Sequence, residues 1–156
     1  MWEQAFHLTL MSALNMAWEA IPYMRKQKWG RIIAMTSISV KQPIGRLMLS
    51  NSLRAAVVGW TKTLADEVAK DNILVNSVCP GYTLTQRVKV LAQNLAQEKN
   101  TQSKEIFKNW EEKIPLGRLA SPEEIANLVV FLASERASYL TGNIIQVDGG
   151  YYRGLI

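Results

Sequence analysis

Three features are scarce in this sequence, and each scarcity excludes a class of protein. Cys79 is the only cysteine among 156 residues, so no internal disulfide can form, which is typical of proteins from a reducing cytoplasm. No run of about 20 uncharged apolar residues occurs, so we expect no transmembrane helix. The N-terminus has neither a basic start nor an Ala-x-Ala-like cleavage site, which argues against a signal peptide. We therefore expect a cytoplasmic protein with no membrane partner.

Acidic residues are in the minority, because 13 Asp and Glu stand against 18 Lys and Arg and give a net charge of +5. A basic surface attracts phosphates, either of nucleic acid or of an anionic substrate carrier. No basic stripe interleaved with aromatic residues occurs, however. We therefore expect no nucleic-acid partner, and we rank nucleic-acid binding below the other functions that are considered.

Two long segments have apolar residues at helical spacing, from Trp2 to about Gln27 and from about Leu47 to Lys70. Pro22 lies near the end of the first segment, and Gly30 is expected to close that helix. Both segments predict long amphipathic helices.

Shorter helices are expected in the second half. Residues 84–113 are more polar and predict helices joined by a mobile connection. At 121–124 a serine precedes a proline and two glutamates, which is the pattern of an N-cap, a first helical residue and first-turn carboxylates. This helix is predicted to run to about Ser134.

Three short apolar runs predict buried strands: Arg31–Thr36, Ile73–Val78 and Asn143–Val147. Residues 37–45 read as a loop. Strands and helices that alternate at these intervals indicate parallel β-α-β units with right-handed crossovers. The predicted fold is therefore a doubly wound α/β layer of three strands, whose first strand leaves one edge without a neighbour.

Several motifs across nearly the whole chain are specific. They are Gly30-Arg31-Ile32-Ile33, Val58-Gly59-Trp60-Thr61-Lys62, Val75-Asn76-Ser77-Val78-Cys79-Pro80-Gly81 with Thr85, Leu116-Gly117-Arg118, Pro122-Glu123-Glu124-Ile125-Ala126, Ser138-Tyr139-Leu140-Thr141-Gly142, and Val147-Asp148-Gly149-Gly150. This set resembles the short-chain dehydrogenase/reductase family, and within it the 3-oxoacyl-acyl carrier protein reductase branch. The resemblance implies a truncated Rossmann-like doubly wound parallel sheet that holds the last three strands of the family sheet.

The family's chain begins with a strand, a glycine-rich turn and a helix whose N-terminus receives the dinucleotide pyrophosphate. No such glycine pattern occurs here, and the first glycine is Gly30. On the resemblance, Trp2–Lys28 matches the long helix that follows those elements. We therefore expect residues 1–156 to form a single partial domain without the N-terminal dinucleotide-binding half.

The resemblance also assigns the catalytic positions. The family's substrate-holding serine falls on Ser37, its acidic tyrosine on Ser50 and its lysine on Arg54, while a supporting asparagine falls on Thr9. A serine hydroxyl is shorter and far less acidic than a tyrosine phenol of pKa about 10, so Ser50 cannot protonate a carbonyl placed for tyrosine. Arg54 keeps the positive charge and can still donate to a ribose hydroxyl or a phosphate. Ser37 can equally cap its own loop.

The resemblance assigns the nicotinamide side of a cofactor site to Pro80, Gly81, Thr83 and Thr85, where the family's loop holds the carboxamide and contacts the phosphates. The cofactor would be NAD or NADP. The alternative is that Pro80 and Gly81 only turn the chain after a strand.

Four other residues are not assigned to a site. His7 is expected to be packed or solvated, Cys79 to be a small core residue, and Glu123 and Glu124 to be helix-start charges. No metal-ligand spacing occurs.

Two functions are ranked above nucleic-acid binding. The first is a family-type NAD(P)-dependent oxidoreductase, not competent as the isolated chain, with an acyl thioester as the substrate in a full-length context. The second, preferred for the isolated chain, is a non-catalytic scaffold or remnant that keeps the family's oligomerisation surfaces. Both predict a homodimer or homotetramer.

Overall fold

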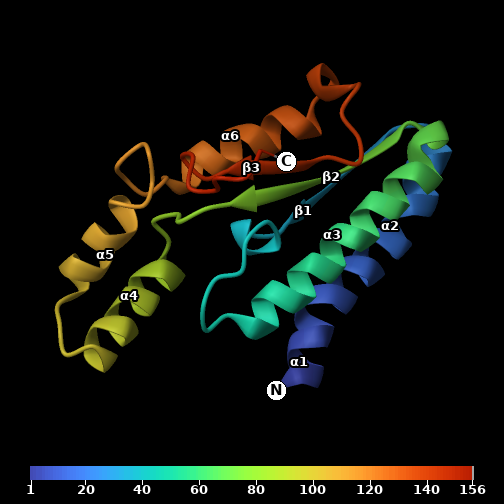
Figure 1. The fold of residues 1–156 in the computed structure, drawn as a ribbon. Helices are drawn as coiled ribbons and strands as arrows, with labels where there is room; N and C mark the ends of the chain where they lie inside the picture. The colour runs from blue at the N-terminus through green and yellow to red at the C-terminus, as the bar shows by residue number, and fades with distance from the viewer. Residues whose placement is uncertain (156) are drawn as a thin grey trace.

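The computed structural model describes residues 1–155 and contains a sheet of three parallel strands (Figure 1). The strands are β1 (Gly30–Met35), β2 (Ile73–Pro80) and β3 (Ile144–Val147), in the spatial order β1-β2-β3. Both pairings are parallel. The predicted three-stranded parallel sheet is confirmed, and the fold is a truncated Rossmann-like α/β layer.

Helices cover both faces of this sheet. The α-helices of residues 1–155 are α1 (Trp2–Phe6), α2 (Ser12–Gln27), α3 (Met48–Val68), α4 (Gln86–Glu98), α5 (Ser103–Glu111) and α6 (Pro122–Ala133). Figure 1 shows α2 and α3 side by side on one face and α6 on the opposite face. The α4–α5 pair lies beyond the carboxyl end of β2 (Figure 1).

The two faces of β2 belong to two separate cores. Ile73 and Val75 pack with α2 and α3, whereas Val78 packs with α6. Successive side chains of a strand point to opposite faces, so one apolar strand supplies both cores. The strand is buried almost throughout, which explains why its residues are mostly apolar, with Asn76 and Ser77 as the buried polar exceptions.

The N-terminal helical segment differs from the single predicted helix in two ways. A π-helical turn at His7–Met11 separates α1 from α2. The helix ends at Lys28, which adopts a left-handed conformation with φ of 53°, and Gly30 is already the first residue of β1. The prediction that Gly30 closes the helix was therefore wrong. The left-handed turn at Lys28 lets the Lys28 amide donate to the Arg25 carbonyl and the Trp29 amide to the Met24 carbonyl, which satisfies two carbonyls at the helix end.

Other boundaries differ by a residue or two. β1 begins and ends one residue before the predicted Arg31–Thr36, and β2 extends past Val78 to Pro80. The third helix stops at Val68, and a 3₁₀ turn at Ala69–Asp71 completes the predicted segment. Tightened final turns of this kind are common at helix ends.

The predicted start of α6 is confirmed in detail. The Ser121 side chain accepts a hydrogen bond from the amide of Glu124, and the Glu124 carboxylate accepts one from the amide of Ser121. This reciprocal capping box satisfies two amides that a helix otherwise leaves unpaired. Pro122 occupies the first helical position.

The free edge of β1 is the part of the fold that is left open. Within residues 1–155, β1 pairs only with β2, so its other edge has no strand partner. Unpaired edges of this kind are surfaces on which another strand or chain can pair. Among the helices of residues 1–155, none combines the length and the hydropathy needed to cross a membrane.

Candidate functional site

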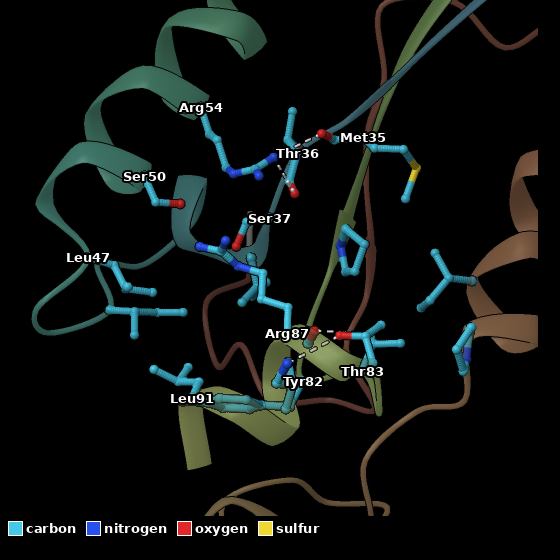
Figure 2. A pocket seen from close by; sticks show the side chains of 18 of the residues that line it. Met35, Thr36, Ser37, Leu47, Ser50, Arg54, Tyr82, Thr83, Arg87 and Leu91 are labelled. Carbon is cyan, nitrogen blue, oxygen red and sulfur yellow. Dashed lines mark hydrogen bonds between the residues drawn. The ribbon is translucent and has the colours of Figure 1, made fainter. Parts of the chain in front are cut away.

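The loops that follow β1 and β2 border a cavity of about 810 Å³ at the carboxyl ends of these strands. Ligands of doubly wound folds bind at this end of the sheet. Seven of the eight residues that the resemblance assigned to a site line this cavity: Ser37, Ser50, Arg54, Pro80, Gly81, Thr83 and Thr85. Figure 2 labels Ser37, Ser50, Arg54 and Thr83 among them. The structure therefore brings together residues that are spread over 49 positions of the sequence, from 37 to 85.

Ser37 lies two residues after the end of β1 and has a structural role. Its Oγ accepts a hydrogen bond of 3.1 Å from the amide of Ser39 and so caps a 3₁₀ turn at Ile38–Val40. This is the capping role that the sequence left open for it. The hydroxyl still lines the cavity, where its proton is free to be donated to a ligand.

Ser50 and Arg54 lie one turn apart in α3, since residues four apart share a helix face. Arg54 reaches across to the end of β1, where its Nη1 donates to the carbonyl oxygens of Met35 and Thr36, at 3.0 Å each. Burial, and next the charge of Arg87, lower the pKa of Arg54 below its ordinary value. Arg54 thus joins α3 to the end of β1, and its side chain also lines the cavity (Figure 2).

Gly81 is required by a close approach of two backbones. A Cβ built at this position would lie 2.8 Å from the Cα of Asp148, so no larger residue fits without movement. The Gly81 amide donates to the Val147 carbonyl at 2.9 Å and extends the pairing of β2 with β3. Pro80 and Gly81 therefore do more than turn the chain, because they hold the loop against β3.

The threonines of this loop shape the entry to α4. The Thr83 hydroxyl donates to the Gly81 carbonyl at 3.2 Å. The Thr85 hydroxyl accepts a bond of 3.4 Å from the Val88 amide and caps α4. Both side chains border the cavity, as do Arg87 and Val88 in the first turn of α4.

Arg87 is a cavity residue that reasoning from the sequence missed. It is the second residue of α4, and its side chain extends into the cavity toward Ser37 (Figure 2). A cation in the first turn of a helix is electrostatically unfavourable, since the amino end of the helix is positive. That unfavourably placed charge, two residues after Thr85, was the signal available in the sequence.

Tyr82 is the one phenol among the residues lining the cavity, and it does not replace the absent acidic tyrosine. Its ring stacks on Trp110 at 4.8 Å and meets Tyr151 edge-on. Burial, and next the neighbouring Tyr151, raise the pKa of Tyr82, which makes it a weaker acid. Tyr82 therefore belongs to the apolar cluster between α4 and α5.

Thr9 lies in the π-helical turn and borders a second cavity of about 800 Å³. Ser50, Arg54 and Arg87 line both cavities, so the two spaces meet at these side chains. π-helical turns are rare and occur frequently at functional sites. This turn is where the resemblance placed the family's supporting asparagine.

The residues that were not assigned to a site have structural roles. His7 is exposed and contacts the ring of Phe6, whereas Cys79 is fully buried, and burial raises the pKa of its thiol. Glu124 accepts two hydrogen bonds from Arg118. These bonds, and next the hydrogen bond from the Ser121 amide, lower the pKa of Glu124 to about 2. Within residues 1–155 no group of three or more potential ligands could hold a metal ion.

Comparison with known proteins gives the same likeness over nearly the whole chain. A family model described as Enoyl-(Acyl carrier protein) reductase matches residues 1–152. The 3-oxoacyl-[acyl-carrier-protein] reductase of Aquifex aeolicus is 40% identical over 152 residues, which cover 97% of this chain and 56% of the relative. The acetoacetyl-CoA reductase of an Acinetobacter species is 36% identical over 152 residues, with the same coverage of 97% and 56%.

Comparison with solved structures gives the same likeness. The crystal structure of L-sorbose reductase from Gluconobacter frateurii, complexed with NADPH and L-sorbose, superimposes with a TM-score of 0.92 at 39% identity and covers 99% of this chain and 59% of that one. The chain thus spans a little more than half the length of the relatives it matches. Over that span both its sequence motifs and its backbone follow theirs, and the chain belongs to the short-chain dehydrogenase/reductase family.

Proposed function

We propose that this chain forms the substrate side of an NAD(P)-dependent carbonyl oxidoreductase, with an acyl thioester or a similar carbonyl compound as the substrate. The observation that carries the proposal is the gathering of Ser37, Ser50, Arg54 and the loop of Pro80–Thr85 around one cavity. A nicotinamide there would donate or accept hydride. The Thr85 hydroxyl, which accepts a hydrogen bond from the Val88 amide, still has a proton to donate to the cofactor's phosphates.

The proposal has a chemical restriction, because the cavity lacks a competent acid. Ser50 stands at the position of the acidic tyrosine, and the phenol of Tyr82 is held by its aromatic neighbours. Arg54 is partly engaged with the carbonyls of Met35 and Thr36. We therefore propose that the isolated chain does not reduce 3-oxoacyl thioesters.

The 156-residue chain is expected to bind NADPH far more weakly than its complete relatives, without micromolar affinity. The physical reason is that no Gly-x-Gly-x-x-Gly pattern occurs in the sequence, and this motif supplies the backbone amides that hold a pyrophosphate. A fluorescence titration with NADPH measures the affinity, with the Aquifex aeolicus reductase titrated in parallel as the positive control. Micromolar binding by this chain would contradict the prediction.

A second candidate function, an oligomerising scaffold, is favoured by the surface of α2. Three large apolar side chains on this helix are exposed: Met16 by 69%, Trp18 by 76% and Tyr23 by 71%. Exposed apolar surface of this kind marks an interface. In the family that the chain resembles, the corresponding helices form a subunit contact. Closed two-fold symmetry is the commonest way to cover such a face.

We therefore expect a homodimer or a larger homo-oligomer in solution. Light scattering coupled to size exclusion should give at least twice the chain mass of 17.6 kDa. Trp18→Arg should shift the population toward monomer, because it places a charge in the buried interface. Leu116→Arg is the matched control, since Leu116 is similarly exposed, by 67%, but lies outside α2. A wild-type monomer at micromolar concentration would rule the scaffold out.

We also propose the cytoplasm as the compartment. The support is the one cysteine, Cys79, which is buried and unpaired. A reduced thiol is typical of this compartment.

A further inference from the structure

Two arginines face the cavity, and no acidic residue does. Arg54 and Arg87 line it, whereas Asp and Glu are absent from its described lining. The second cavity, which meets the first at these two side chains, likewise has no acidic residue in its described lining. Clefts lined by charge of one sign concentrate ligands of the opposite sign.

Arg87 has no counter-ion of its own in the described part of the chain. The ion pairs found there use Arg25, Arg46, Lys108 and Arg118. Arg87 instead lies close enough to Arg54 for its positive charge to lower the pKa of Arg54, second only to burial as a cause. Two like charges held together in this way are stabilised by an anion placed between them.

The position of Arg87 within α4 adds to this argument. It occupies the first turn, where the helix dipole disfavours a cation and favours an anion. An anion bound there would interact with both arginines and with the amino end of α4. The hydroxyls of Ser37 and Ser50 border the same space and offer further donors (Figure 2).

Most of the rest of the cavity wall is apolar. Leu47 lies at the start of α3 and Leu91 in α4, and both line the cavity beside Arg87 (Figure 2). Ile125 and Val129 contribute a second apolar surface from α6. A bare inorganic ion would leave this surface unused, whereas a ligand with an apolar body would cover it.

We propose that Arg54 and Arg87 together bind the oxyanion, a carboxylate or a phosphate ester, of an organic substrate whose apolar body lies against Leu47 and Leu91. Guanidinium groups match both oxyanions, because they donate two parallel hydrogen bonds. The proposal goes beyond the oxidoreductase assignment, since anion binding needs no nicotinamide and is measured without it.

The test is calorimetric titration of the 156-residue chain with hexanoate, with hexyl phosphate and with the neutral hexanamide. We expect at least one of the two anions to bind and hexanamide not to bind. Arg87→Gln should weaken anion binding about tenfold or more, the usual effect of losing a charge-assisted hydrogen bond. Lys89→Gln removes the same charge from an exposed position of α4 outside the cavity lining and should change the affinity less than about twofold.

Three results would overturn the proposal: no binding of either anion, equal binding of hexanamide, or equal weakening by Arg87→Gln and Lys89→Gln. Competition by NADPH that disappears in Arg87→Gln would assign the arginine pair to a dinucleotide phosphate and would also overturn the substrate proposal. Arg54→Gln should weaken anion binding as well. If that variant does not fold, because Arg54 joins α3 to β1, Arg87→Gln alone decides.

Discussion

Leu132→Ala is expected to lower the free energy of unfolding by about 2–5 kcal/mol. Leu132 in α6 is fully buried, at 0% exposure, in the core between this helix and the sheet. Truncation removes apolar surface from the core and leaves a cavity that the rigid sheet cannot close. Urea-induced unfolding followed by circular dichroism measures the change.

Val130→Ala is the matched control for this prediction. Val130 lies in the same helix, but its side chain is 68% exposed. The expected change is within about 0.5 kcal/mol, as for most surface substitutions. Similar losses for the two variants would show that α6 does not pack on the sheet through Leu132.

The second large effect concerns the catalytic positions. In a chimera that joins the N-terminal part of the Aquifex aeolicus reductase to this chain, the double change Ser50→Tyr with Arg54→Lys is expected to raise 3-oxoacyl thioester reduction about 10²–10⁴-fold. A positioned phenol supplies the missing acid, and a neighbouring ammonium lowers its pKa. Both positions line the cavity, which has room for the larger ring. NADPH consumption measures the rate.

Ser50→Phe with Arg54→Lys is the control, because it adds the ring without the hydroxyl. This variant should remain inactive if the phenol is the acid. A chimera with the original Ser50 that consumes NADPH steadily, and loses that activity on Ser50→Ala, would show that the serine itself carries the acid chemistry.

Local patterns were sufficient to predict most of the fold. The mostly apolar residues of β2 indicated a buried strand, and β2 is buried on both faces. The serine, proline and two glutamates at 121–124 predicted the start of α6, where the capping box forms. Such signals need no distant contact, since the residues concerned lie within one turn or one strand of each other.

Exact ends and irregular turns were not predictable in this way. The left-handed cap at Lys28 and the π-helical turn at His7–Met11 have no local residue signature. Helix ends depend on which carbonyls and amides the neighbouring elements leave free. The expectation that Gly30 closes the first helix was wrong for this reason.

The sequence by itself determined the family likeness and the positions of Ser37, Ser50 and Arg54, because motif spacing survives without coordinates. Only the tertiary structure decided what these side chains contact. It joined Arg54 to the end of β1 and brought Arg87, 33 positions further along the chain, to the same cavity. Because the strands are parallel, their carboxyl ends all lie at the same edge of the sheet. Residues that follow different strands, and are far apart in the sequence, therefore meet at this edge.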